Sequence, residues 1–141
     1  MVQKTDILEL LEKAKTIAVV GCSPKPERDS HRVAAHLQAA GYRVIPINPG
    51  ADEILGVKAY PDLASIPAEV EIDIVDVFRR PEHIPAVVDA VLLRGTKALW
   101  LQLGCANPEA EQRARDAGLE VVSDLCIKIE HQARAAGLDL L

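Results

Sequence analysis

The residues best placed to do chemistry follow the first apolar run of the chain. Residues 16–21 end on Gly21, and the polar loop Cys22-Ser23-Pro24-Lys25-Pro26-Glu27-Arg28 leads from there into a helix that starts near Ser30. Such a run is typical of a buried parallel strand. In the first strand-loop-helix unit of a doubly wound sheet, free backbone N–H groups and the helix dipole point to one place and bind phosphate there. The pattern therefore predicts a phosphate-bearing ligand.

The same loop lacks the marks of two familiar nucleotide sites. A dinucleotide fingerprint needs G-x-G-x-x-G after the first strand and an acidic residue at the end of the second. Gly21 stands alone, and the second apolar run ends in Asn48-Pro49. The P-loop pattern G-x-x-x-x-G-K-[ST] is also missing from the sequence. NAD and ATP are therefore disfavoured, and a phosphate-bearing ligand of another kind is expected.

Strand-like and helix-like segments alternate along the whole chain and must position this loop. Strands are predicted at 16–21, 42–47, 54–60, 72–78, 98–103 and 119–122. Helices are predicted at about 5–14, capped by Thr5 or Asp6, and at 30–40, 81–93, 108–117 and 123–136. The alternation predicts a Rossmann-like, doubly wound α/β fold: a mainly parallel sheet of about five strands with helices on both faces. We expect the strand order 3-2-1-4-5.

Composition and charge exclude several classes of function. The 141 residues suit one domain over 1–141, with an N-terminal helix at about 5–14 and a core at 16–136. A net charge of −5 and 3% aromatic residues argue against nucleic-acid binding, which uses a basic face or stacking rings. No apolar run approaches the roughly 20 residues that span a bilayer. The three cysteines lack metal-site spacing, so we expect a cytoplasmic protein with reduced thiols, no metal and no membrane partner.

Seven motifs, in order between residues 16 and 131, carry a family resemblance. They are Val20-Gly21-Cys22-Ser23-Pro24, Ser30 with Val33, Gly41-Tyr42-Arg43-Val44-Ile45-Pro46-Ile47-Asn48-Pro49, Leu55-Gly56 with Tyr60, Asp76-Val77-Phe78-Arg79-Arg80-Pro81-Glu82, Trp100-Leu101-Gln102-Leu103-Gly104, and Cys126-Ile127-Lys128-Ile129-Glu130-His131. With them the chain resembles the small stand-alone CoA-binding proteins with a Rossmann-like fold, which are related to the CoA-binding domain of the succinyl-CoA synthetase α-subunit. The resemblance implies that the ligand is coenzyme A, held by the first loop, the end of the second strand and the Phe-Arg-Arg segment.

The expected site lies where the carboxyl ends of the parallel strands meet along one edge of the sheet. CoA carries a pyrophosphate and a 3′-phosphate, so several donors and at least one guanidinium should face it. The candidate binding residues are Gly21, Cys22, Ser23, Pro24, Lys25, Arg28, Ser30, Asn48, Pro49, Phe78, Arg79, Arg80, Gln102 and Gly104. No catalytic residue is predicted.

Plainer structural roles stay open for several of these candidates. Gly21 also fits a tight turn, Ser30 fits a helix N-cap, and Asn48-Pro49 fits a simple strand stop. The side chains of adjacent residues diverge, so we expect one of Arg79 and Arg80 on a phosphate rather than both.

Other conspicuous side chains carry weaker expectations. Trp100 lies inside a predicted strand and is expected in the core. The four histidines have no paired acid or nucleophile visible in the sequence and are expected on the surface. Cys22 and Cys126 lie near the starts of predicted helices, where the dipole would favour a thiolate, although a buried and inert thiol fits each position too.

Two functions from different classes fit these patterns. The first is a CoA-binding protein, non-catalytic on its own, that holds CoA or an acyl-CoA at the carboxyl edge of the sheet. In the synthetase, as the resemblance implies, the ligase chemistry depends on a further domain and a partner subunit. The alternative is a small enzyme or a redox-responsive regulator that acts on a CoA thioester or CoA disulfide. A partner protein is also open, and an apolar helix face at residues 7–11 suggests a homodimer.

Overall fold

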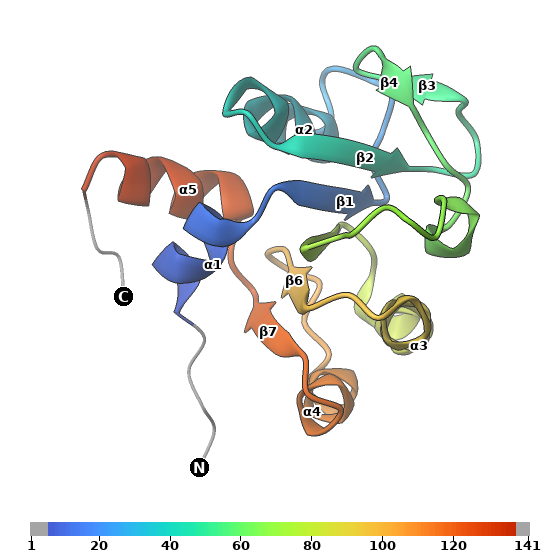
Figure 1. Ribbon diagram of the computed structural model, residues 1–141, viewed down its shortest axis with the longest axis vertical. Helices are drawn as coiled ribbons and strands as arrows, with labels where there is room; N and C mark the ends of the chain where they lie inside the picture. The colour runs from blue at the N-terminus through green and yellow to red at the C-terminus, as the bar shows by residue number, and fades with distance from the viewer. Residues whose placement is uncertain (1–5, 138–141) are drawn as a thin grey trace.

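Five short parallel strands form the central sheet of the protein, whose computed structural model describes residues 6–137 (Figure 1). The strands are β1 (Thr16–Val20), β2 (Arg43–Ile47), β5 (Ile74–Val77), β6 (Ala98–Leu101) and β7 (Glu120–Ser123). They lie side by side in the order β2-β1-β5-β6-β7. Most of their residues are apolar and many are β-branched, as expected for strands covered on both faces. The predicted Rossmann-like α/β fold is confirmed.

The predicted strand at 54–60 does not join this sheet. Its residues contribute instead to a hairpin of two very short antiparallel strands, β3 (Glu53–Ile54) and β4 (Val57–Lys58). Leu55 and Gly56 between them have φ of 55° and 74°, the two positive values of a tight hairpin turn. Only Tyr60 reaches the sheet, in an isolated parallel bridge to Ile47. With 54–60 counted as the third strand, as predicted, the sheet order is 2-1-4-5-6. The predicted order of the second, first, fourth and fifth strands is confirmed, and only the prediction of 54–60 as a strand of this sheet is wrong.

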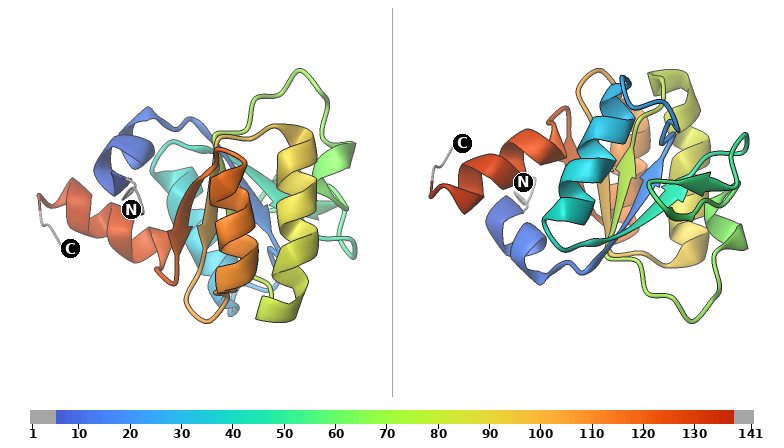
Figure 2. Two further views of the ribbon diagram at one scale, coloured as in Figure 1. Left: turned by 90° about the horizontal axis from the view of Figure 1, so that it is seen from below. Right: turned by 90° about the horizontal axis from the view of Figure 1, so that it is seen from above.

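Helices cover both faces of the sheet (Figure 2). On one face lie α1 (Ile7–Lys13), α2 (Asp29–Ala39) and α5 (Ile127–Ala135). On the other lie α3 (Ile84–Arg94), α4 (Pro108–Asp116) and the short 3₁₀ turn η1 (Leu63–Ser65). Successive strand residues point to opposite faces, so each strand contributes to both cores. None of the helices in this described part of the chain is long and apolar enough to cross a membrane.

The helix ends follow the sequence signals in most places. Asp6 caps α1 by accepting a hydrogen bond from the Glu9 N–H at 3.1 Å, and Thr5, the other candidate cap, lies outside the described residues. Asn107 caps α4, and Gly95 ends α3 with φ of 82°. Pro81 starts the separate 3₁₀ turn η2 (Pro81–His83), which precedes α3.

The α1 face that suggested a homodimer is partly packed inside the protein. Ile7 and Leu11 are 5% and 4% exposed, because α1 lies against α5 and the adjacent core. Within residues 7–11, Leu8 stays 45% exposed, so only part of the expected apolar face is free, and the homodimer stays a prediction.

Two aspartates of the fourth predicted strand have opposite environments. Asp73, just before β5, accepts hydrogen bonds from the N–H groups of Lys15 and Thr16 at 2.9 and 3.0 Å. Asp76 lies within β5, in register between Val19 and Trp100, and is fully buried. Neither of its carboxyl oxygens has a partner among the described residues. Burial raises the pKa of Asp76 well above its usual value, because desolvation disfavours the charged carboxylate.

Replacing Asp76 by Asn is expected to remove a pH dependence of stability. The folded protein keeps Asp76 protonated while the unfolded chain ionises it above about pH 4, so the folded state binds more protons and is destabilised as pH rises. Between the unfolded and folded pKa values, the parent should lose up to about 1.4 kcal/mol per pH unit relative to Asp76→Asn. Urea unfolding of both proteins across this range measures the difference. If the free energies of unfolding of the two proteins changed equally with pH, a raised pKa of Asp76 would be contradicted.

Candidate functional site

The candidate site is the carboxyl edge of the sheet, where the loops after β2, β1, β5 and β6 follow one another. All the residues predicted for the site lie in these loops or in the first turn of α2. Because β1 lies between β2 and β5, the first loop, residues 21–28, has the loops at 48–50 and 78–80 on its two sides. The structure therefore brings the predicted residues to one edge, as the strand pattern indicated.

Hydrogen bonds tie the start of the first loop to the end of β2. The N–H groups of Gly21 and Cys22 donate to the carbonyl of Ile47 at 3.0 and 3.2 Å. The Asn48 amide donates to the Cys22 carbonyl at 2.9 Å and accepts from the Gly50 N–H at 2.7 Å. Asn48 thus fixes the shape of two adjacent loops with both ends of its side chain.

Gly21 lies against the loop on the other side. Its φ is 82°, and an added Cβ would lie 2.3 Å from the carbonyl oxygen of Phe78, far inside van der Waals contact. The same Cβ would lie 3.5 Å from Cδ of Arg79, so the Arg79 side chain passes beside the first loop. Glycine is required here because two backbones approach closely, and this approach places an arginine next to the predicted phosphate loop.

The serines of the first loop bind one another. Helix α2 starts at Asp29, and its N-cap position, Arg28, makes no capping bond with its side chain. Ser30 lies in the first turn and is buried, and its hydroxyl accepts from the Ser23 N–H at 3.0 Å. The expected N-cap role of Ser30 is therefore wrong, because the helix begins before it and its hydroxyl holds the loop. The Ser23 hydroxyl in turn accepts from the Lys25 N–H at 3.1 Å.

Four exposed cations lie on the two adjacent loops: Lys25, Arg28, Arg79 and Arg80. Within residues 6–137, none of the four makes an ion pair. Among the helix arginines, Arg94 donates to backbone carbonyls, and Arg32, Arg113, Arg115 and Arg134 each pair with a carboxylate. The carboxyl edge therefore offers unpaired positive charge in a chain whose net charge is −5, which favours an anionic ligand.

The end of β6 is bound to the start of α5. Gln102 is buried, and its side-chain oxygen accepts from the Ile127 N–H at 3.0 Å. The Gly104 N–H donates to the Asp124 carboxylate at 2.9 Å, and Asp124 has φ of 61°. The side chain of Gln102 is thus engaged inside the protein, while Gly104 stays at the exposed rim.

The three thiols differ in access. Cys22 is fully buried, and desolvation together with the nearby Asp76 raises its pKa to about 11. The expectation that the helix dipole would favour a thiolate at Cys22 is wrong, because its side chain packs into the core beneath the loop. Burial also raises the pKa of the Cys105 thiol. Cys126 is partly exposed at the start of α5.

One histidine pair was missed by sequence reasoning. Nε2 of His36 on α2 lies 2.9 Å from Nδ1 of His131 on α5, although the two residues are 95 positions apart. Both rings are intermediate in burial, as is that of His31, so what the sequence did not indicate is their contact. No local pattern marks them, because their contact depends on how two helices pack on the same face of the sheet.

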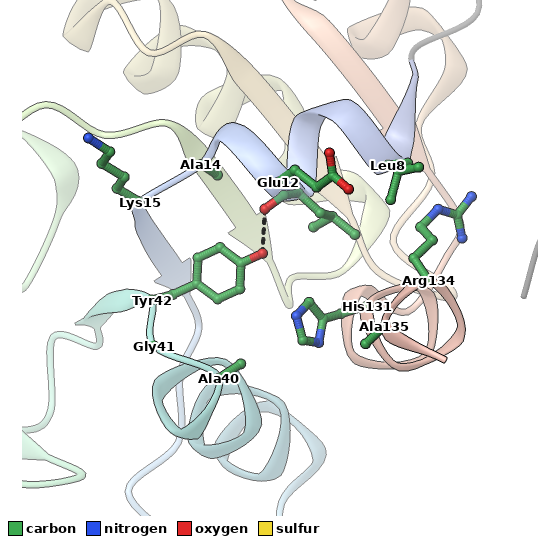
Figure 3. A pocket seen from close by; sticks show the side chains of 11 residues that line it. Leu8, Glu12, Ala14, Lys15, Ala40, Gly41, Tyr42, His131, Arg134 and Ala135 are labelled. Carbon is green, nitrogen blue, oxygen red and sulfur yellow. Dashed lines mark hydrogen bonds between the residues drawn. The ribbon is translucent and has the colours of Figure 1, made fainter. Parts of the chain in front are cut away.

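A cavity of about 370 Å³ lies at the opposite, amino end of the strands (Figure 3). Lys15 and Tyr42, which immediately precede β1 and β2, help to line it, together with residues of α1 and α5. The Tyr42 hydroxyl donates to the Leu11 carbonyl and holds α1 against the end of the sheet. Because it lies at the amino end of the strands, this cavity is separate from the edge that carries the predicted residues.

Comparison with known proteins identifies the family. A sequence profile described as "CoA binding domain" matches residues 15–132. The chain belongs to this family. The predicted resemblance is thereby confirmed, and the carboxyl edge described above is that of a CoA binding domain.

Relatives of this CoA binding domain include short and long proteins. An uncharacterized protein, YneT, of Bacillus subtilis is 47% identical over 91% of this chain and 93% of its own length. A hypothetical protein from Pyrococcus horikoshii, whose structure is solved, is 40% identical with a TM-score of 0.87, covering 93% of this chain and 91% of that one. An ADP-forming acetate–CoA ligase of Archaeoglobus fulgidus is 29% identical over 71% of this chain but only 15% of the ligase. The domain thus corresponds to a small part of the ligase chain.

Replacing Gly21 by Ala should destabilise this CoA binding domain more than the same change at Gly41. Both glycines have positive φ, 82° and 100°, but no atom lies within 4 Å of a Cβ added at Gly41. Gly41→Ala should cost about 1–2 kcal/mol of unfolding free energy through backbone strain. Gly21→Ala should cost a further 1–3 kcal/mol, roughly, because of the clash with the Phe78 carbonyl. Urea unfolding of the two variants measures this, and equal losses would show that the clash relaxes freely.

Proposed function

We propose that this protein binds coenzyme A, or an acyl-CoA, at the carboxyl edge of its sheet and is not itself a catalyst. The observation that carries the proposal is the set of four exposed cations without ion pairs in the described chain, on the two loops that meet at Gly21. Membership of the CoA binding domain family supports CoA as the anion. The proposal treats residues 1–141 as one binding domain.

The first loop and the start of α2 are suited to the phosphates of CoA. The first N–H groups of a helix have no partner inside the helix, and α2 has no side-chain cap at its N-terminus. Phosphate oxygens can accept from these groups, in line with the helix dipole. Arg79 reaches the same loop from β5, and a guanidinium forms two parallel hydrogen bonds to a phosphate. Arg28 and Lys25 add positive charge on the other side of the loop.

The proposed absence of catalysis follows from how the candidate reactive groups are engaged. Nucleophilic catalysis needs an activated nucleophile with a base in hydrogen-bond reach. The Cys22 thiol is buried with a pKa of about 11, which disfavours the reactive thiolate. The Asp124 carboxylate accepts the Gly104 N–H and holds a loop. The Archaeoglobus ligase, named for joining acetate to CoA, matches this chain over 15% of its length, which supports CoA holding as the shared role.

Ligand preference provides a first test. Calorimetric titrations with CoA, dephospho-CoA and NAD should rank the three in that order of affinity, with one CoA per chain. The 3′-phosphate should matter because the four cations exceed what a pyrophosphate alone can engage. Native mass spectrometry of the purified protein complements the titrations by detecting any CoA that co-purifies. Equal affinity for CoA and NAD would contradict the ligand assignment.

The double variant Arg79→Ala/Arg80→Ala should bind CoA about ten- to a hundred-fold more weakly, because the loss of one charge-assisted phosphate contact costs about 1.5–3 kcal/mol. Both side chains are exposed, so the urea midpoint should stay that of the parent. Lys15→Ala/Arg43→Ala is the matched control, since it removes the same charge from exposed residues at the opposite ends of β1 and β2. If both double variants weaken CoA binding equally, the arginines act only through net charge.

A further inference from the structure

Two imidazole rings join the last turn of α2 to α5, beside the cavity at the amino end of the strands. Nε2 of His36 lies 2.9 Å from Nδ1 of His131, and the ring centroids are 5.0 Å apart in an edge-to-face arrangement. The ring of Tyr42 packs edge-on against His131, with centroids 5.7 Å apart. The contact is therefore a hydrogen bond between two histidines that is held in place by a third ring.

The chemistry of this pair limits how many protons it can hold. In the neutral pair, one facing nitrogen donates and the other accepts. A first added proton can go to a nitrogen that points away, and the hydrogen bond persists. A second added proton must occupy the facing nitrogen that accepted, so two N–H groups then oppose each other. Double protonation therefore breaks the bond and leaves two positive charges in contact.

The surroundings of the pair disfavour positive charge. Burial, then His131, then Lys128 lower the pKa of His36. Of the other charged groups near the pair, Arg134 of α5 binds Glu130 and Arg32 of α2 binds Asp29. Glu12 of α1 and Lys15 face the cavity beside Tyr42. A histidine whose folded pKa is lowered stabilises the fold fully above its ordinary pKa of about 6.5, and this stabilisation is lost as pH falls.

Both joined helices begin at the edge proposed to hold CoA. In the first turn of α2, the Ser30 hydroxyl accepts from the Ser23 N–H of the phosphate loop. At the start of α5, the Ile127 N–H donates to Gln102 at the end of β6. A shift of α5 relative to α2 would therefore move groups that shape the edge.

We propose that the His36–His131 pair is a proton-operated latch between α2 and α5 that lowers CoA affinity in acid. When both rings are protonated, the interhelical bond is lost and α5 loosens from α2. The helix starts then no longer hold the loops of the carboxyl edge in their binding arrangement. The latch regulates the proposed CoA site, so this part of the inference rests on the proposed function.

Protons can reach the latch from the amino end of the strands. His131 and Tyr42 line the cavity of about 370 Å³ there, whose wall is formed by α1, α5 and the turn before β2 (Figure 3). The histidine ring is thus accessible from a hollow that is remote from the ligand edge. Proton uptake and ligand binding can occur at opposite ends of the same two helices.

A first experiment tests the latch without ligand. Amide hydrogen exchange of the free protein, corrected for intrinsic rates, is measured at about pH 7.5 and about pH 5, on either side of the ordinary histidine pKa. Protection in α5 should fall about tenfold in acid, a modest coupling effect, while α3 and α4 on the other face serve as internal references. Ring ¹⁵N resonances of the histidines, followed through the same range, should show the pKa of His36 below the ordinary histidine value. Unchanged α5 protection in acid would overturn the latch.

The matched variant is His36→Gln/His131→Asn. A glutamine amide can replace Nε2 and an asparagine amide can replace Nδ1, so the variant keeps a hydrogen bond that cannot be protonated in this range. Its α5 protection should no longer depend on pH. Should this variant fail to fold, the ring titration of the parent decides the matter, since an ordinary pKa for the His36 ring would overturn the proposal. His31→Asn is the control that removes a histidine of α2 outside the pair.

A second experiment connects the latch to CoA. The parent and His31→Asn should lose about tenfold more CoA affinity than the paired-amide variant between about pH 7.5 and about pH 5. Protonation of the CoA phosphate, with a second pKa of about 6, weakens binding in every variant, so the difference between variants is the readout. Equal losses in all three proteins would overturn the regulation. If no protein binds CoA at either pH, the proposed function fails, while the exchange experiment still tests the latch.

Discussion

The backbone of Gly21 passes so close to the Phe78 carbonyl that a Cβ would lie 2.3 Å from its oxygen. This approach joins the loop after β1 to the loop after β5, and the carbonyl of Ile47 joins it to β2 on the other side. Two cation-bearing segments that are about fifty residues apart in the chain thereby share one edge. If residue 21 had a side chain, the loop after β5 could not approach this closely. Arg79 would then lie farther from the first loop, and the positive charges would be dispersed.

The same constraint determines which groups remain for a ligand. Hydrogen bonds within and between the loops engage the polar side-chain atoms of Asn48, Ser23 and Ser30. The Cys22 side chain lies in the core, and desolvation together with the nearby Asp76 raises its pKa, which disfavours the reactive thiolate. What remains at the surface is backbone N–H groups and flexible cations. Recognition of a phosphate-rich ligand needs little else, because charge and free donors supply both affinity and orientation.

Helices α2 and α5, which lie on the same face of the sheet, extend this arrangement away from the carboxyl edge. Each begins with a bond to a loop of the carboxyl edge, and the two are joined further along by His36 and His131. Such a network is rigid when all its hydrogen bonds are formed. Protonation of the histidine pair can therefore change the position of the loops at the carboxyl edge. The helices of the opposite face are joined by charged groups instead: Arg113 of α4 pairs with Asp89 of α3. There too, Arg94 donates to the carbonyls of Leu63, Ile66, Pro67 and Val70 and closes a surface segment.

The sequence by itself determined the alternation of strands and helices and the family. It therefore also determined that Gly21, Lys25 and Arg79 would meet at one edge, since the carboxyl ends of parallel strands must do so. It misjudged residues 54–60, because a two-residue turn with positive φ folds that segment back on itself.

Only the tertiary structure decided what each side chain does at that edge. Ser30 was expected as a cap and instead holds the loop, and Gln102 was expected at the ligand and instead holds α5. The contact between His36 and His131 joins residues 95 positions apart. Periodicity in the sequence indicates which face of a helix or strand a residue occupies. Which hydrogen bonds its side chain makes depends on strand register and helix packing, and no local pattern encodes these.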